Sequence, residues 1–127
     1  MKSGHEMLVV EDSLSVCALI KTHLEKAGHV VHTASSDEGA ISVLEAKKID
    51  FVLCDIMIES KGAKTGYHVL KYIKQSPKLS QVPVVIMTQK RDDGTAKTTA
   101  ERLGSNGFLH KPFEMKELDE VIQQLLK

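Results

Sequence analysis

Two carboxylates stand where the first apolar run of the chain ends. Residues Met7 to Val10 are apolar, and Glu11 and Asp12 follow at once. Adjacent carboxylates repel each other, so either a cation compensates them or they stay in water. Asp12 alone could also cap a helix that opens at Ser13. The pair therefore indicates chemistry only if other reactive side chains reach the same place.

Three more reactive side chains stand at the ends of later apolar runs, namely Asp55, Thr88 and Lys111. Each has an ordinary explanation by itself, because loops often carry aspartate, threonine is common in strands and Lys-Pro pairs are frequent. Together with Glu11 and Asp12 they make a coherent set of three carboxylates, one hydroxyl and one ammonium. Such a set can act only if the fold gathers it at one place.

Short apolar runs alternate with helical patterns along the whole chain. The runs are residues 7–10, 30–34, 51–54, 84–87 and 108–109. The first, third and fourth are continuous rather than alternating, as in strands of a parallel sheet that are covered on both faces. The run at 30–34 ends in plain serines, as expected of an edge strand.

The expected helices lie between and after these runs. They are residues 13–27, a helix around 40–44, a helix through 69–73 that ends before Pro77, residues 96–103, and a helix from 115 to the C-terminus. Strict alternation predicts the α/β class, as a doubly wound five-stranded parallel sheet of flavodoxin-like order 2-1-3-4-5. Ligands of such sheets bind beyond the carboxyl ends of the strands, where the reactive side chains would meet.

The gathered set predicts phosphoryl chemistry. Three carboxylates a few ångströms apart would force at least one pKa upward unless a cation sat among them. Oxygen ligands that leave room for water favour Mg²⁺. A carboxylate beside Mg²⁺, an ammonium and a hydroxyl can accept a phosphoryl group, because these groups balance the charge of its oxygens. Glu11 and Asp12 are therefore expected to hold Mg²⁺ and Asp55 to be the phosphoryl acceptor.

Four stretches, LVVEDS, FVLCDIM, PVVIMT and GSNGFLHKPF, resemble the motifs of the receiver domain of bacterial two-component response regulators. The resemblance covers essentially the whole chain and implies one (βα)5 receiver domain over residues 1–127. We expect residues 1–6 to be a flexible N-terminal segment. The chain is then either a single-domain regulator or the receiver of a longer protein.

The resemblance implies a role for each residue of the site. Asp12 would bind Mg²⁺ directly and Glu11 through water, with the main-chain carbonyl of Met57 completing the metal site. Lys111 would bind the phosphoryl group, and Thr88 would close onto it.

The resemblance also implies partners and a switch. A sensor histidine kinase or a histidine phosphotransfer protein would phosphorylate Asp55, and the signal would pass to a downstream protein target. Phe108 would move inward as the second switch residue. The face that changes would be formed by the fourth helix, the fifth strand and the fifth helix. A cis bond between Lys111 and Pro112 is also implied.

The sequence departs from the family pattern near the site. Glu59 replaces the usual proline, and Gly66 arrives three residues late, so residues 56–66 form a lengthened loop. The extra length is either a tolerated surface insertion or a partner-specific contact. Phe108 stands where tyrosine is commoner.

Three residues near the acceptor are candidate modulators of dephosphorylation. Met57 cannot usefully orient an attacking water, and Gln89 replaces a small residue and can shield the site. Lys90 is a poor general base while protonated. We therefore expect slow loss of the phosphoryl group, although the Gln89 amide could instead bind the water and assist.

Composition excludes several functions. Basic and acidic residues number 17 each, which gives no electrostatic footprint for nucleic acid or for an anionic membrane. No apolar run approaches the ~20 residues that span a bilayer, and no signal peptide is visible. Cys17 and Cys54 lie in apolar stretches without metal-site spacing, which favours a soluble, cytoplasmic protein.

Other functions remain open at this point. A small phosphatase with an aspartate nucleophile would want a second acid two residues after Asp55, where Met57 stands. A flavodoxin-like cofactor binder would want a glycine-rich phosphate loop, and none follows any expected strand. A receiver-like domain that has lost phosphorylation and only binds partners is the third alternative. We expect a regulator rather than an enzyme, apart from its own phosphoryl transfer and dephosphorylation.

Overall fold

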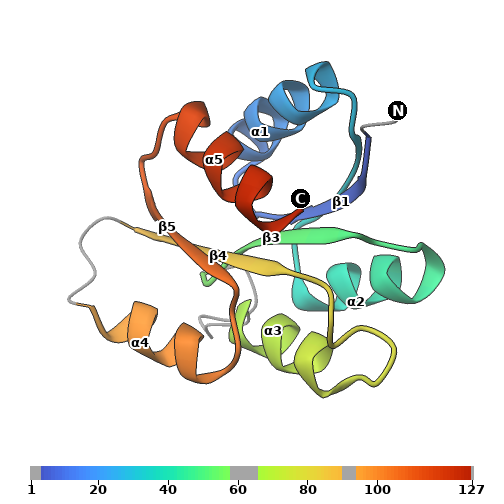
Figure 1. The fold of residues 1–127 in the computed structure, drawn as a ribbon, viewed down its shortest axis with the longest axis vertical. Coiled ribbons are helices and arrows are strands. Elements are labelled where there is room, and N and C mark those ends of the chain that lie inside the picture. Colours follow the sequence, from blue (N-terminus) through green and yellow to red (C-terminus); the bar gives the residue numbers. More distant parts are fainter. Residues whose placement is uncertain (1–3, 58–65, 90–93, 127) are drawn as a thin grey trace.

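The computed structural model describes residues 4–57, 66–89 and 94–126. Within them, parallel strands form one sheet of order β2-β1-β3-β4-β5, as predicted (Figure 1). The strands are β1 (Glu6–Val10), β2 (Val30–Ala34), β3 (Phe51–Asp55), β4 (Val84–Gln89) and β5 (Gly107–Lys111). Their register places Met7 opposite Phe51, and Met87 opposite Leu109. All the carboxyl ends therefore lie along one edge.

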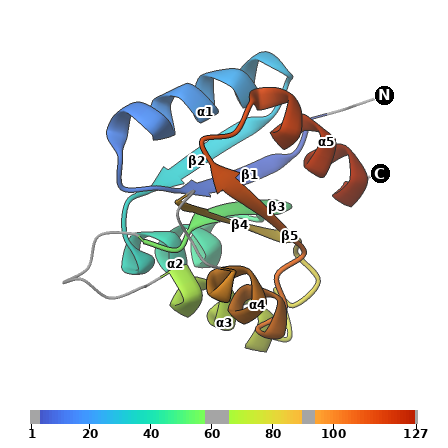
Figure 2. The same ribbon diagram turned by 90° about the vertical axis from the view of Figure 1, so that its left-hand side faces the viewer.

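Helices cover both faces of the sheet. They are α1 (Leu14–Lys26), α2 (Asp37–Ala46), α3 (Gly66–Gln75), α4 (Thr95–Arg102) and α5 (Met115–Leu125). α1 and α5 lie on one face, and α2, α3 and α4 lie on the other (Figures 1 and 2). Among the described residues, no helix has the length and apolar character that a membrane span requires.

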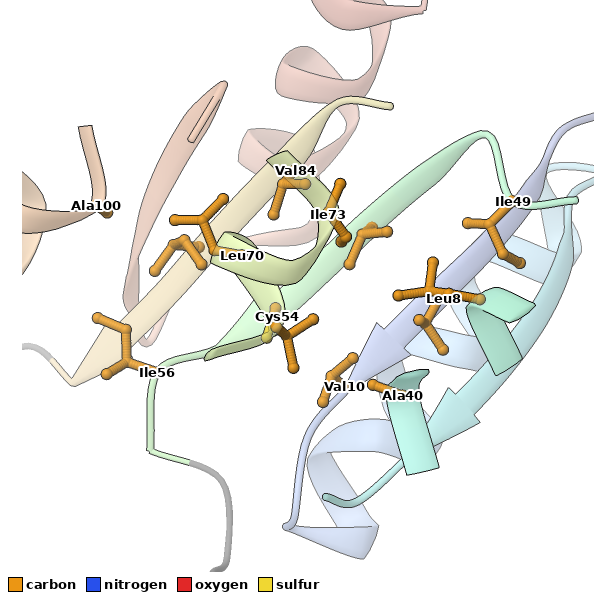
Figure 3. Close-up of a cluster of buried hydrophobic side chains, with 14 of the residues drawn as sticks. Leu8, Val10, Ala40, Ile49, Cys54, Ile56, Leu70, Ile73, Val84 and Ala100 are labelled. Atoms are coloured by element: carbon orange, nitrogen blue, oxygen red, sulfur yellow. The ribbon is translucent and has the colours of Figure 1, made fainter. Parts of the chain in front are cut away.

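The continuous apolar runs reflect burial on both faces. Along β1, Leu8 and Val10 face the helices α2 and α3, whereas Met7 and Val9 face α1 and α5, and all four are fully buried. Figure 3 shows the first of these cores, where side chains of α3 lie over β3 and β4. An edge strand needs less apolar surface, and Val30 of β2 is half exposed.

One local expectation needs correction, and one of the alternatives for Asp12 is excluded. The flexible N-terminal segment does not reach residue 6, because β1 begins at Glu6 and its N–H donates to the Asp50 carboxylate at 2.9 Å. Asp12 does not cap α1. Ser13 is the N-cap, and its hydroxyl accepts from the Val16 N–H at 3.4 Å. Asp12 is thus not used by the helix and lies exposed beside Glu11.

Candidate functional site

The carboxyl ends of four strands bring the predicted residues together. Glu11 and Asp12 follow β1, Asp55 ends β3, Thr88 lies near the end of β4 and Lys111 ends β5. The carboxylates of the first three offer oxygens that all lie within 4.8 Å of one another. Parallel pairing places these ends side by side, although the residues are far apart in the sequence.

Burial raises the energetic cost of placing these carboxylates close together. Glu11 is 2% exposed and Asp55 3% exposed, whereas Asp12 is open to solvent. The pKa of Glu11 is raised, chiefly by its burial and further by the charge of Asp55, against the opposing effect of Lys111. The N–H of Ser13 also donates to Glu11 Oε2 at 3.0 Å. The site therefore has a surplus of negative charge and one open side.

Lys111 supplies the compensating cation. Its Nζ donates to Glu11 Oε1 at 2.7 Å and to Asp55 Oδ2 at 2.6 Å. Burial disfavours its ammonium, but the hydrogen bonds to both carboxylates and their charges outweigh this and raise the pKa of Lys111. The Lys111–Pro112 bond is cis, as the family resemblance implies. One ammonium thus holds two buried carboxylates that would otherwise repel each other.

The acceptor carboxylate is held at both oxygens. Asp55 Oδ1 accepts from the Met57 N–H at 3.0 Å, while Oδ2 accepts from Lys111. The peptide that carries the Met57 N–H therefore lies next to the carboxylate, and the Met57 side chain is 44% exposed. Such a fixed orientation suits a nucleophile, because less freedom is lost when the reaction begins.

The two expected switch residues lie on adjacent strands. Thr88 of β4 is buried and stands opposite His110 of β5, while Phe108 stands opposite Ile86. Phe108 is half-buried, packs against the core under α3 and meets the His110 ring edge-on, with centroids 5.2 Å apart. Thr88 follows Met87, which pairs with Asp55, and by strand alternation it lies on the same face of the sheet as Ile86 and Phe108, the face that α4 covers.

A hollow of about 680 Å³ opens from the carboxylates toward α1 and the start of α5. Its far walls are apolar and were not expected from the sequence; they comprise Val16, Leu19, Ile20, Phe113 and Met115. A signal was available, because Leu14 and Leu19 fall outside the buried stripe of α1 and are 81% and 63% exposed. Exposed leucines beside a polar site indicate a contact surface.

The lengthened loop does not separate α3 from the acceptor. Gly66 begins α3, and its N–H donates to the Ile56 carbonyl at 3.0 Å. A side chain there would place a Cβ 2.2 Å from the Asp55 carbonyl oxygen. The late glycine thus makes a contact that only glycine permits, which sequence reasoning did not foresee. Glu59, most of the loop, Lys90 and the side chain of Gln89 lie outside the described residues.

Comparison with known proteins points to one family. The model of the response regulator receiver domain matches residues 7–123. The probable transcriptional regulator ycf27 of Cyanidium caldarium is 30% identical over 126 residues, which cover 99% of this chain and 48% of that protein. The chain spans about half the length of the curated relatives that it matches first.

Solved structures agree with this match. A candidate response regulator from Chloroflexus aurantiacus is 30% identical, with a TM-score of 0.88 and 98% of both chains covered. The receiver domain of a sensor histidine kinase from Pseudomonas aeruginosa shares the fold at 24% identity, with a TM-score of 0.83 over 97% of this chain and 98% of that one. That structure has a magnesium ion coordinated in its active site cleft.

Proposed function

The chain belongs to the response regulator receiver domain family of two-component systems, and we propose that it signals through phosphorylation of Asp55. One observation carries this proposal. Asp55 is buried at the meeting point of three carboxylates and is held between the Lys111 ammonium and the Met57 N–H. A structural aspartate would not need two further acids against it.

The donor set fits Mg²⁺. Three carboxylates offer oxygens within 4.8 Å of one another, and the exposed Asp12 leaves a side through which the ion and its waters can enter. Asp12 would bind the ion directly and Glu11 through water, with Asp55 and the Met57 carbonyl as the other ligands. When bound, the ion neutralises charge on the phosphoryl oxygens.

Different residues of this chain would carry out different parts of the phosphoryl transfer. An Asp55 oxygen attacks phosphorus, and the bond from phosphorus to the donor nitrogen breaks, so that the electron pair returns to the imidazole of the donor. Lys111 already contacts Asp55 Oδ2 and would pair with a phosphoryl oxygen there. The Thr88 hydroxyl would donate to another of these oxygens.

The donor reaches Asp55 through the mouth of the hollow. Receiver domains pair with sensor histidine kinases, and a phosphohistidine enters this site only if its protein seats beside the opening. Leu19 and Met57 line this hollow and are exposed, and Leu14 is exposed at the start of α1. We therefore place the kinase, or a histidine phosphotransfer protein, on the α1 side with an apolar contact to these residues.

The output side lies at the β5 edge of the sheet, where α4 and α5 flank the strand on opposite faces (Figure 1). Closure of Thr88 onto the phosphoryl group would leave space behind it that Phe108 can enter, which would change the face formed by α4, β5 and α5. Curated relatives are named as transcriptional regulators and are about twice as long as this chain. The downstream target is thus a protein segment that reads this face, in the same polypeptide or in another.

Phosphorylation is tested with acetyl phosphate and Mg²⁺. We expect intact-mass analysis to show one added phosphoryl group on the wild type and none on Asp55→Asn. Equal labelling of both proteins would show that a residue other than Asp55 accepts the phosphoryl group. An unlabelled wild type would favour the alternative, a receiver-like domain that only binds partners.

The signal is expected to decay slowly. Met57 offers no hydrogen bond to an attacking water, and Gln89 and Lys90 follow Thr88 at positions from which they could affect its approach. Loss of the phosphoryl group at fixed Mg²⁺ should be faster in Met57→Asn and in Gln89→Ala than in the wild type. Slower decay in Gln89→Ala would show that this amide assists hydrolysis instead.

A further inference from the structure

The first turn of α3 is locked to the main chain of the acceptor. A Cβ on Gly66 would lie 2.2 Å from the Asp55 carbonyl oxygen and 2.6 Å from the Ile56 Cα, so the two backbones are already in contact. The Gly66 N–H donates to the Ile56 carbonyl at 3.0 Å. Because this contact leaves no free space, a shift of the Asp55 main chain must shift the start of α3.

The buried thiol of Cys54 strengthens this contact. It lies 3.5 Å from the Asp55 carbonyl oxygen and 4.0 Å from the Gly66 carbonyl oxygen. Cys54 is fully buried in the core under α3 (Figure 3). The end of β3 and the start of α3 are thus joined both by a main-chain hydrogen bond and by a shared side chain.

The next residue reaches α4. Tyr67 is half-buried against the same core, and its hydroxyl donates to the Ala96 carbonyl in the first turn of α4 at 3.4 Å. The buried residues of α4 are two alanines, Ala96 and Ala100, which give it little apolar contact with the body. Figure 3 shows Ala100 at the margin of the core. Contacts from neighbouring elements therefore matter more for α4 than for the other helices.

We propose that Gly66 and Tyr67 form a link that passes a change at Asp55 to α4, separately from Thr88 and Phe108. The contacts run from the acceptor main chain to the first residue of α3, and from the next side chain to α4. The proposal rests on the proposed function in one respect, since phosphorylation supplies the change. Tyr67 is a positioning residue in this scheme and does not touch the phosphoryl group.

The link itself is tested without any phosphoryl group. Tyr67→Phe removes the hydroxyl that reaches α4, and Tyr72→Phe is the matched control, because that hydroxyl lies on the same helix and donates to Glu45 of α2 at 2.9 Å. Amide hydrogen exchange over residues 96–103 should be about threefold faster in Tyr67→Phe and unchanged in the control. Unchanged exchange in Tyr67→Phe, or equal acceleration in both variants, would overturn the link.

The coupling is tested with beryllofluoride and Mg²⁺, read by amide chemical shifts. The shifts at Asp55 and Ile56 should be the same in wild type and both variants, whereas the shifts over α4 should be roughly twofold smaller in Tyr67→Phe alone. A full α4 response in Tyr67→Phe would overturn the coupling. If even the wild type shows no shift at Asp55, the proposed function fails, and the exchange measurement then decides on the link by itself.

Discussion

The two ends of the sheet both carry acidic side chains, but these acids are partnered in different ways. At the amino end, the Glu6 carboxylate pairs with His32 at 2.7 Å. The Asp50 carboxylate accepts the Glu6 N–H at 2.9 Å and lies 3.9 Å from His5. Each acid therefore has its own partner, and these side chains remain partly exposed to water.

At the carboxyl end, one ammonium serves more than one acid. Lys111 contacts both Glu11 and Asp55, while Asp12 adds a third carboxylate to the group. Among the described residues, no such group of three potential ligands exists at the amino end. Acids at a strand end are unremarkable when each has its own partner, whereas buried carboxylates that share one cation indicate a site for a metal ion and a phosphoryl group.

The largest expected effect comes from removing the shared cation. Lys111→Met leaves Glu11 and Asp55 buried without a cationic partner, so we expect the free energy of unfolding to fall by about 3 kcal/mol. His32→Gln at the amino end is the control and should cost less than about 1 kcal/mol. Urea unfolding without metal at pH 7.5 measures both. If both variants lost the same free energy of unfolding, the charges at the two ends of the sheet would not differ in their contribution to stability.

Metal binding should relieve the crowding of negative charge at the carboxyl end of the sheet. Saturation with Mg²⁺ at 100 times its Kd should stabilise the wild type by about 2.7 kcal/mol. Asp12→Ala should weaken Mg²⁺ binding by more than about tenfold and more than Glu11→Ala does, since a direct ligand is lost in place of a water-held one. Thermal melts with and without Mg²⁺ show which of the two variants binds the ion more weakly. The reverse order would exchange the roles of the two carboxylates.

A third change affects communication rather than stability. Thr88→Ala should still accept a phosphoryl group at Asp55, but it should transmit less of the change to α4, β5 and α5, because the Thr88 hydroxyl is gone and only the Gly66–Tyr67 link to α4 remains. NMR shifts in residues 95–125 with and without beryllofluoride measure this response. Equal responses in the wild type and in Thr88→Ala would reject the coupling role.

The smallest effect is expected at an ordinary pair on the helices. The hydrogen bond with His68 lowers the pKa of Asp37, at 2.7 Å. A folded-state pKa below the unfolded value of about 3.9 gives stability that is present above that pH and lost as the pH falls through the folded value. Asp37→Asn should therefore cost about 0.5 kcal/mol at pH 7, and this cost should shrink as the pH falls through the folded-state pKa. A cost that does not change with pH would show that the effect comes from packing instead.

Local sequence patterns predicted which strands and helices exist better than they predicted the residues where these begin. The continuous runs at 51–54 and 84–87 became β3 and β4, which are buried on both faces. The N-terminus of α1 was ambiguous, because Asp12 and Ser13 are both good capping residues. The chain path decided in favour of Ser13, which left Asp12 available to the site.

Contacts between segments far apart in the chain could not be predicted from the sequence. The late position of Gly66 suggested an insertion at the site, yet its backbone contact with Asp55 shows that α3 begins against the acceptor. The apolar wall of the hollow was also missed, because Phe113 precedes α5 and Met115 begins it, and both meet Leu19 of α1 only in the folded chain. Helical spacing alone does not show which residues of two helices share a cavity.

The order of strands and helices in the sequence was enough to bring Glu11, Asp12, Asp55 and Lys111 together, because parallel strands place all their carboxyl ends at one edge and these residues stand at those ends. The contacts between these side chains depend on the folded chain. The Lys111 ammonium lies 2.7 Å from Glu11 and 2.6 Å from Asp55, and both acids are buried while Asp12 is exposed. The physical reason is that charge energies and pKa depend on distances and solvent exposure, which arise from packing between segments far apart in the chain.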